Sequence, residues 1–188
     1  MKLIVDDSNE ACERLRSMLI ACGETEKEIE VETLPRKARE RVAAGDYELL
    51  FLDVEMPRMT GMELLKSVRA DGYTGHAIFT TSHHKYSIQA LREEALDYLL
   101  KPVMHQELKD ALERFYSKRR AYEKNFEALM EYGLTKRQIE IARRIFQGKT
   151  SAQIADELFL SKHTVDTHRR NMLKATGCKS TTELFRLL

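Results

Sequence analysis

The stretch that most constrains the fold of this 188-residue chain is LLFLDVEMPRMTG, residues 49–61. Its four leading apolar residues, followed by a loop that contains Pro57, predict a strand that is buried on both faces of a sheet. Asp53 ends this strand, and a capping box of Thr60 and Glu63 starts a helix soon afterwards. A carboxylate at the carboxyl end of a central strand lies where open parallel α/β sheets place their chemistry. Taken alone, Asp53 could simply be an acidic residue that ends a strand.

The first half of the chain alternates short apolar runs with segments of helical periodicity. This alternation predicts a doubly wound α/β fold with a parallel sheet of five strands. Right-handed crossovers place the carboxyl ends of such strands along one edge of the sheet. The strands are expected at 3–5, 29–34, 49–52, 76–81 and 96–100, and the helices after Ser8 and at 35–44, 61–70 and 84–94.

Polar residues follow four of these predicted strands. They are the pair Asp6 and Asp7, then Asp53, the pair Thr80 and Thr81 at the end of the fourth strand, and Lys101. Three converging carboxylates repel one another, and a bound Mg²⁺ ion relieves that repulsion because it prefers oxygen ligands. A hydroxyl group and an ammonium group nearby suit the oxygens of a phosphoryl group. The pattern therefore predicts phosphoryl transfer to a carboxylate, giving an aspartyl-phosphate. The alternative is an ion-pair cluster in which Lys101 only neutralises the acids.

These motifs resemble those of the receiver domain of bacterial two-component response regulators. The resemblance rests on the acid pair at 6–7, the block DVEMPRMTG, Thr81 and the Lys101-Pro102 pair. The segment IFTTSHHKYSIQALREEALDYLLKP is similar to receivers that are attached to LytTR output domains. The resemblance implies a flavodoxin-like fold, a histidine kinase as phosphate donor, and a cis peptide bond before Pro102.

The resemblance also implies roles for individual residues. Asp53 is expected to be the phosphoacceptor, and Asp7, Asp53 and the backbone carbonyl of Glu55 are expected to hold Mg²⁺, with Asp6 assisting. Lys101 would contact the phosphoryl group. Thr81 and Tyr98 would be the switch pair that transmits phosphorylation to the far side of the domain.

Residues 104–132 contain neither Gly nor Pro and are predicted to form a helix rather than a flexible linker. Apolar residues recur along it at 108, 112, 115, 122, 126 and 129. The part beyond Phe115 should lie out of reach of the sheet, because a helix advances about 1.5 Å per residue. Its apolar positions then need another partner, which is either a second copy of the same helix or the C-terminal module.

The C-terminal module, residues 133–188, is basic and helical. It has 11 Lys/Arg against 5 Asp/Glu, net +6, whereas residues 1–103 have 14 against 19, net −5. Capping boxes at Thr135, Thr150 and Ser180 predict helices at 135–147, 151–158, 162–175 and 180–188. The turn 159–161 gives the second and third helices helix-turn-helix spacing. Basic charge favours a nucleic-acid partner, but a bundle this small could also bind protein.

The third of these helices has two distinct faces. Val165, Met172 and, in part, His168 are expected to face inward, and the opposite face carries His163, Asp166, Thr167, Arg170 and Lys174. A polar and basic face on the second helix of such a pair is what the major groove of DNA requires. Arg170, at the centre, is expected to contact guanine, and Lys162, Arg169 and Lys174 the phosphates. The alternative is a face that is merely solvated.

Residues 134–188 resemble the LuxR-type helix-turn-helix of NarL-class regulators, most specifically in TVDTHRRNML. Asp166 departs from that family because its position is commonly basic. An aspartate can accept a hydrogen bond from cytosine N4 but repels phosphate. Leu184, Leu187 and Leu188 are expected to form a dimer seam.

We therefore predict a cytoplasmic transcriptional regulator, not an enzyme, that is phosphorylated on Asp53 and binds double-stranded DNA as a homodimer when phosphorylated. Its expected parts are a receiver domain (1–116), a helical linker (117–132) and a LuxR-type DNA-binding domain (133–188). No signal peptide or membrane contact is expected. Two alternatives stay open, namely an aspartyl-phosphate hydrolase and a regulator whose last module binds protein.

Overall fold

The computed structural model describes residues 1–82, 95–147 and 149–188. The chain divides into two compact units, Met1–Tyr116 (unit 1) and Ser117–Leu188 (unit 2). The helix predicted at 84–94 lies outside the described residues.

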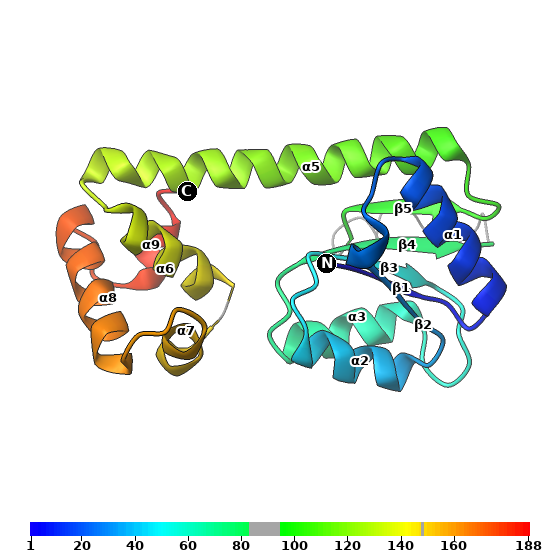
Figure 1. Ribbon diagram of the computed structural model, residues 1–188, viewed down its shortest axis with the longest axis horizontal. Coiled ribbons are helices and arrows are strands. Elements are labelled where there is room, and N and C mark those ends of the chain that lie inside the picture. The colour runs from blue at the N-terminus through cyan, green and yellow to red at the C-terminus, as the bar shows by residue number, and fades with distance from the viewer. Residues whose placement is uncertain (83–94, 148) are drawn as a thin grey trace. The chain divides into compact units, whose positions relative to one another are not determined.

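The described part of unit 1 is built on a five-stranded parallel sheet with the strand order β2-β1-β3-β4-β5, which confirms the predicted α/β architecture (Figure 1). The strands are β1 (Lys2–Val5), β2 (Ile29–Glu32), β3 (Leu49–Asp53), β4 (His76–Thr81) and β5 (Asp97–Leu100). Because β3 lies at the centre and all strands are parallel, Asp53 lies at the same edge of the sheet as the carboxyl ends of β1 and β4.

Helices cover both faces of this sheet (Figure 1). Helices α1 (Asn9–Ala21) and α5 (His105–Ala128) contribute to the core on one face, and α2 (Pro35–Ala44) and α3 (Gly61–Ala70) to the core on the other. A short 3-10 turn, Glu26–Glu28, precedes β2. The α1 helix begins where Ser8 accepts a hydrogen bond from the backbone of Ala11, as predicted.

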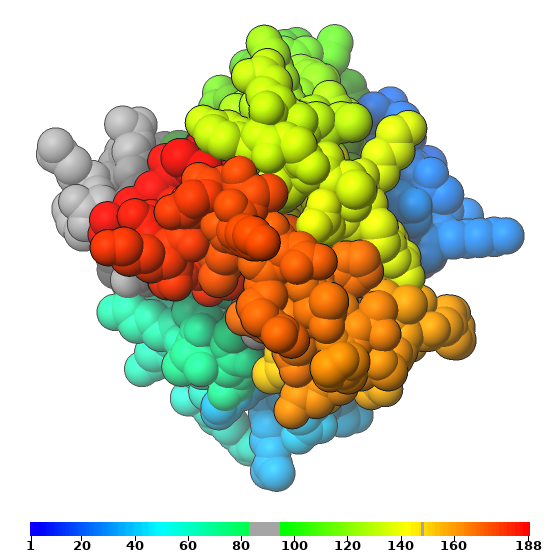
Figure 2. Space-filling model, turned by 90° about the vertical axis from the view of Figure 1, so that its left-hand side faces the viewer, coloured from blue at the N-terminus to red at the C-terminus, as the bar shows by residue number. Residues whose placement is uncertain are grey.

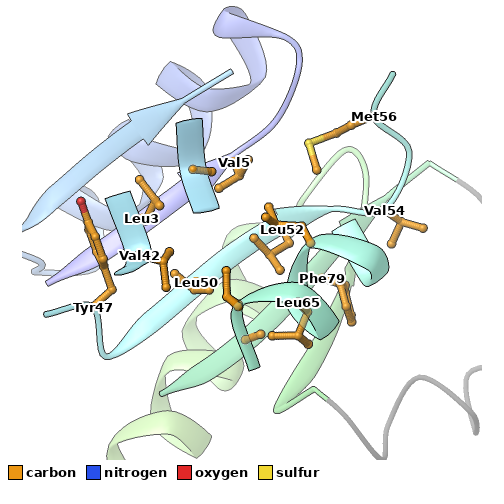
Figure 3. Packing of buried hydrophobic residues seen from close by; sticks show 14 residues of the cluster. Leu3, Val5, Val42, Tyr47, Leu50, Leu52, Val54, Met56, Leu65 and Phe79 are labelled. Carbon is orange, nitrogen blue, oxygen red and sulfur yellow. The ribbon is translucent and has the colours of Figure 1, made fainter. Parts of the chain in front are cut away.

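The central strand owes its continuous apolar run to burial on both sides. Leu50 and Leu52 pack towards α2 and α3 (Figure 3), whereas Leu49 and Phe51 pack towards α1 and α5. All four side chains are completely buried. Burying each contributes roughly 1.5–3 kcal/mol, so β3 is a rigid support for the carboxylate that follows it.

Unit 2 is all-helical in its described residues. It contains the end of α5, a 3-10 turn (Leu129–Tyr132), α6 (Lys136–Phe146), α7 (Ser151–Glu157), α8 (Lys162–Thr176) and α9 (Thr181–Phe185). Thr135 and Thr150 form the predicted reciprocal capping boxes. The third predicted box is wrong in detail, because the Glu183 carboxylate accepts a hydrogen bond from Lys179 instead of Ser180. Helix α9 is also shorter than the predicted 180–188.

The end of the linker helix belongs to the core of unit 2. Phe126 and Leu129 are buried there, and the Phe126 ring packs edge-on against Phe146 with 5.7 Å between centroids. Tyr122 also contacts the Phe146 ring, although it remains 41% exposed. Of the two partners considered for these apolar positions, the C-terminal module is therefore the one that covers Phe126 and Leu129.

Candidate functional site

Three carboxylates meet at the carboxyl edge of the sheet. Asp6 follows β1, and Asp53 is the last residue of the adjacent β3. One carboxylate oxygen from each of Asp6, Asp7 and Asp53 lies within 4.8 Å of the other two. Asp6 and Asp53 are buried, whereas Asp7 is exposed. The backbone N–H of Ser8 donates to Asp6 Oδ1 at 2.9 Å and fixes that carboxylate. The site is thus accessible to solvent at Asp7, and the carboxylate of Asp6 is held in place.

Lys101 completes this acidic cluster. Its Nζ lies 2.6 Å from Asp6 Oδ2 and 2.9 Å from Asp53 Oδ1. The Lys101-Pro102 peptide bond is cis, as predicted. The backbone N–H of Lys101 donates to the carbonyl oxygen of Thr81 at 2.7 Å, which ties this loop to the end of β4.

The electrostatics of the site favour an additional cation. Burial raises the pKa of Asp53, the Lys101 ammonium opposes this shift, and the charges of Asp6 and Asp7 add to it. Burial alone would lower the pKa of Lys101, but its hydrogen bonds to Asp6 and Asp53 raise the pKa overall, so it stays charged. One ammonium facing three carboxylates leaves an excess of negative charge. Oxygen donors with excess negative charge fit Mg²⁺.

The predicted switch residues lie on one face of the sheet. Thr81 is completely buried at the end of β4, and Tyr98 on β5 packs partly buried against the core below α2 and α3. Tyr98 pairs in register with Phe79, which lies two residues before Thr81 on β4. Because alternate residues of a strand point to the same face, the side chains of Thr81 and Tyr98 project to the same side of the sheet. Glu55 lies in the loop after β3 with its side chain exposed.

Helix α8 of unit 2 has the two predicted faces. Val165 and Met172 are completely buried, which confirms the inward face. Lys162, His163, Arg170 and Lys174 are exposed, whereas Asp166, Thr167, Arg169 and His168, which was expected to face inward in part, are partly buried. Figure 2 faces unit 2 and shows the orange segment that contains α8 exposed over much of its length.

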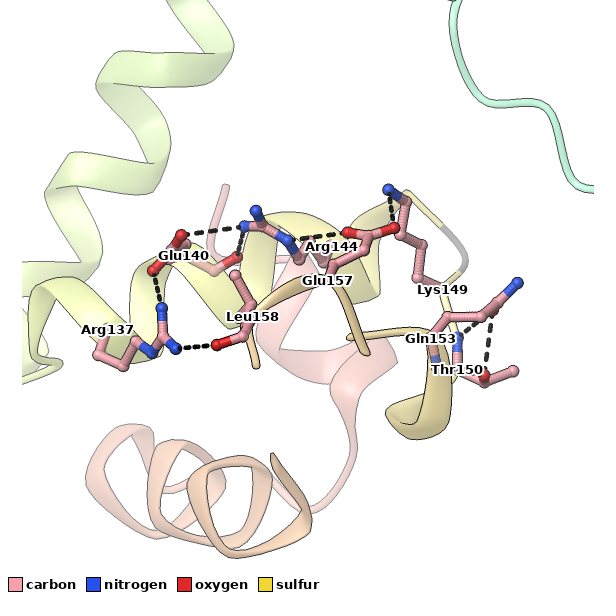
Figure 4. A network of polar contacts seen from close by, with 8 residues as sticks. All are labelled: Arg137, Glu140, Arg144, Lys149, Thr150, Gln153, Glu157 and Leu158. Atoms are coloured by element: carbon pink, nitrogen blue, oxygen red, sulfur yellow. Dashed lines mark hydrogen bonds and ion pairs between the residues drawn. The ribbon is translucent and has the colours of Figure 1, made fainter. Parts of the chain in front are cut away.

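Cations on α6 and α8 differ in their partners. Arg137 is paired with Glu140 at 2.6 Å, and Arg144 with Glu157 at 3.1 Å (Figure 4). Arg143 is paired with Glu123 at 2.5 Å. The four cations of α8, which are Lys162, Arg169, Arg170 and Lys174, have no ion pair with any residue in the described ranges. Helix α8 therefore carries four cations that have no counter-ion among the described residues.

Comparison with known proteins agrees with this geometry. Residues 3–113 match the response regulator receiver domain family, and residues 133–188 match the bacterial regulatory proteins of the luxR family. The chain belongs to the response regulators. The similarity to LytTR-linked receivers is a minor misnomer for this chain, because the receiver matches the general receiver family and the output module is of the LuxR type.

Relatives of this response regulator cover the chain to different extents. The response regulator protein TmoT of Ectopseudomonas mendocina is 28% identical over 98% of the chain and 86% of TmoT. An uncharacterized response regulatory protein of Yersinia pestis is 37% identical over 60% of the chain, which spans about half of that relative (46%). The structure of the response regulator StyR matches with 28% identity and a TM-score of 0.54, covering 99% of this chain and 96% of StyR.

The expected dimer seam of this response regulator needs a correction. Leu184 is completely buried in the core of unit 2, so it is not available to a second copy. Leu188 is partly buried, and its backbone carbonyl accepts a hydrogen bond from Asn125 at 2.6 Å. Leu187 is 40% exposed and is the member of the predicted seam that a partner can reach.

Other contacts of the response regulator left no signal in the sequence. Arg169, expected to contact phosphate, donates to Ser151 Oγ at 3.1 Å and so joins α8 to α7. The guanidinium of Arg137 also donates to the carbonyl oxygen of Leu158 at 3.0 Å (Figure 4). Both contacts join helices through tertiary packing, which periodicity and capping patterns do not encode. No helix in the described ranges is both long and apolar enough to span a membrane.

Proposed function

We propose that this response regulator accepts a phosphoryl group on Asp53 from a histidine kinase and that phosphorylation controls the binding of unit 2 to double-stranded DNA. The observation that carries this proposal is the position of Asp53. Its carboxylate shares the ammonium of Lys101 with Asp6 and lies within 4.8 Å of Asp7. A nucleophilic carboxylate, a metal-binding acid pair and a fixed cation are the groups that phosphoryl transfer needs.

In the proposed reaction, an Asp53 oxygen attacks phosphorus and the phosphorus–nitrogen bond of a phosphohistidine breaks. Asp6, Asp7, Asp53 and the backbone carbonyl of Glu55 would hold Mg²⁺, which when bound supplies positive charge to the phosphoryl oxygens. Lys101 would hold a second phosphoryl oxygen by an ion pair.

The switch in this proposal uses the face of the sheet that carries Thr81 and Tyr98. The Thr81 hydroxyl would turn towards the new phosphoryl oxygens, and Tyr98 would move with it. Phosphorylation would thereby shift an existing equilibrium between two states of unit 1. The outcome proposed for the phosphorylated chain is a homodimer, with the exposed Leu187 in its interface.

The test of the phosphoacceptor is labelling with a small phosphodonor in the presence of Mg²⁺. Asp53→Asn should abolish covalent labelling and leave the fold intact, because the two side chains are nearly isosteric. Asp7→Asn should weaken Mg²⁺ binding and shift the Mg²⁺ dependence of labelling to higher concentration. Labelling at another residue in Asp53→Asn would refute the assignment, and repeated turnover of the donor would indicate a hydrolase instead.

The DNA part of the proposal rests on the unpaired cations of α8. Arg170 would read guanine in the major groove, a contact worth roughly 1–3 kcal/mol of discrimination, whereas Lys174 would contact phosphate. Arg170→Ala should lose preference at one base position per half-site, and Lys174→Ala should weaken binding to all sequences alike. Asp166→Ala separates two roles, because specificity falls if Asp166 reads cytosine and affinity rises if it only repels phosphate.

Binding isotherms on footprinted and random duplexes check these expectations. If Arg170→Ala and Lys174→Ala lose the same binding affinity on both duplexes, Arg170 contacts phosphate and does not read a base. No DNA binding at all, with capture of a protein instead, would support the protein-binding alternative.

A further inference from the structure

Unit 1 contains a buried ionic cluster at the amino edge of the sheet, opposite the edge that carries Asp53. Lys2 is the first residue of β1, and its Nζ lies 2.6 Å from Oε2 of Glu24, which follows α1. Both side chains are only 6% exposed. The hydroxyl of Tyr116 on α5 lies 2.7 and 2.9 Å from the two Glu24 carboxylate oxygens and donates its hydrogen to this carboxylate. One carboxylate thus joins β1, the end of α1 and α5.

The members of this cluster differ in what their removal would cost. Lys2 and Glu24 neutralise each other, and breaking a buried ion pair is strongly destabilising because it leaves a charge without a partner. Tyr116 is only partly buried, and if its hydroxyl moves away, Glu24 keeps its ion pair with Lys2. Tyr116 is therefore the member that can detach from the cluster while no buried charge is left unpaired.

The Tyr116 hydroxyl keeps its proton at neutral pH. Burial raises the pKa of Tyr116, and its hydrogen bond to Glu24 raises the pKa further. A neutral hydroxyl that donates to a carboxylate forms a charge-assisted hydrogen bond, which is stronger than a bond between neutral groups. The contact therefore holds α5 without adding a third charge to the cluster.

Tyr116 holds α5 at the place where this helix leaves unit 1. It is the last residue of unit 1, and the preceding Phe115 is buried in the core that α1 and α5 form with the sheet. The next five residues, 117–121, are all exposed. Tyr122 follows them, and its ring contacts Phe146 of unit 2. The hydrogen bond from Tyr116 therefore fixes the helix directly before its solvated part.

Two elements, β1 and α1, connect this cluster with the acid pair of the phosphorylation site. Strand β1 starts at Lys2 and ends one residue before Asp6, which is about 13 Å along the chain. Helix α1 starts directly after Ser8, whose backbone N–H holds the Asp6 carboxylate, and ends three residues before Glu24. A movement of β1 or α1 at the phosphorylation site would thus reach the cluster through regular secondary structure.

We propose that the hydrogen bond between Tyr116 and Glu24 is a regulatory contact, which restrains α5 in the unphosphorylated protein and is broken when Asp53 is phosphorylated. This inference rests on the proposed function, in which phosphorylation controls DNA binding by unit 2. Because the contact can open without leaving a buried charge unpaired, its open and closed states can both be populated, which is what a population shift requires. Unit 2 binds DNA more tightly in the open state.

The first test compares DNA binding by the full-length protein before and after complete labelling of Asp53. Phosphorylation should raise the affinity of wild type about 5–150-fold, the range typical of allosteric coupling. Tyr116→Phe keeps the ring and the buried ion pair but loses the hydroxyl, so the unphosphorylated variant should already bind DNA like the phosphorylated protein. Tyr122→Phe is the matched control, because it removes an exposed hydroxyl from the same helix and should keep the wild-type ratio.

The second test follows hydrogen exchange in peptides that cover residues 112–121, and it does not depend on DNA. Exchange should be faster in Tyr116→Phe than in wild type, and phosphorylation should produce the same increase in wild type but not in Asp53→Asn. If Tyr116→Phe only unfolds at a lower urea concentration, with the wild-type affinity ratio and exchange response retained, the hydrogen bond is merely structural and the proposal is overturned.

The outcomes separate this inference from the proposed function. If the protein binds no DNA, a phosphorylation-dependent increase in exchange at 112–121 leaves the regulatory contact standing while the proposed function fails, and no increase refutes both. If Asp53 cannot be labelled, tighter DNA binding by Tyr116→Phe than by wild type supports the restraint on α5 while the proposed phosphoryl transfer fails. If phosphorylation changes DNA affinity equally in wild type and Tyr116→Phe, the proposed function stands and the regulatory contact is refuted.

Discussion

Replacing Phe126 by alanine tests whether the end of the linker helix is part of the folded output module. The Phe126 ring is 4% exposed, packs edge-on against Phe146, and lies 5.7 Å below the guanidinium of Arg143. Phe126 precedes the segment that matches the luxR family, which begins at residue 133. A module that starts at residue 133 therefore lacks part of this core.

The size of the effect follows from the burial of the ring. Phenylalanine-to-alanine changes in cores reduce the free energy of unfolding by about 3–5 kcal/mol, because transfer and cavity terms add. A unit of about 70 residues is stable by roughly 4–10 kcal/mol. The substitution should therefore remove between about a third and all of the stability of unit 2. A loss of 3 kcal/mol lowers the unfolding temperature of a domain of this size by at least about 12 °C.

The assay is hydrogen exchange with mass spectrometry, which reports the two units separately, supported by urea denaturation followed by circular dichroism. Peptides of unit 2 should exchange faster in Phe126→Ala, and peptides of unit 1 should not. Tyr122→Ala is the control, because that ring also contacts Phe146 but is 41% exposed, and it should lose only about 1 kcal/mol. Equal small losses in both variants, or a loss that depends on protein concentration, would refute the reasoning and favour pairing with a second copy.

For two other perturbations, the structure predicts the direction in which stability or Mg²⁺ affinity changes. Burial raises the pKa of Asp53, so the Mg²⁺-free native state holds this proton more tightly than the unfolded chain and should lose stability as the pH rises through that pKa. For the same reason Mg²⁺ affinity should fall as the pH drops towards that pKa. Calorimetric unfolding and Mg²⁺ titration of wild type and Asp53→Asn across pH check the two statements, since the variant should lack the part of each dependence that Asp53 contributes. Phe159→Gly should raise the free energy of unfolding of unit 2 by up to about 1 kcal/mol in urea titrations, because φ of +53° is unfavourable for Phe159 and its 96% exposed side chain contributes no burial.

Sequence reasoning succeeded where topology leaves little choice. An apolar run flanked by Asp53, with crossovers of one hand, can only bring Asp6, Asp53 and Lys101 to a single edge of the sheet. The ion pairs of Lys101 with both acids follow from that convergence. The roles proposed for Thr81 and Tyr98 came from resemblance, and the structure adds that their side chains share a face.

Sequence reasoning failed where the outcome depends on tertiary packing. Leu184 was expected on an exposed seam, but α9 ends at Phe185 and presents Leu184 to the core of unit 2. The partner of Arg169 was missed because Ser151 lies 18 residues earlier in the chain, and no helical periodicity links the two. For the same reason, the sequence of the linker did not decide between two partners, since its apolar positions fit either a second copy of the helix or the adjacent C-terminal module.

The internal neutralisation of the α6 arginines has a kinetic consequence. Arg137, Arg143 and Arg144 are each offset by a glutamate, whereas the four cations of α8 have no ion pair among the described residues, so the charge of unit 2 is uneven and the module acquires an electric dipole. In the electric field of a polyanion such a dipole would turn the module before contact, so that α8, the helix proposed to read DNA, would arrive first. Positive charge added to α6 would strengthen the attraction between the module and the polyanion but weaken this alignment. Association would then be faster, but more encounters would have the wrong orientation.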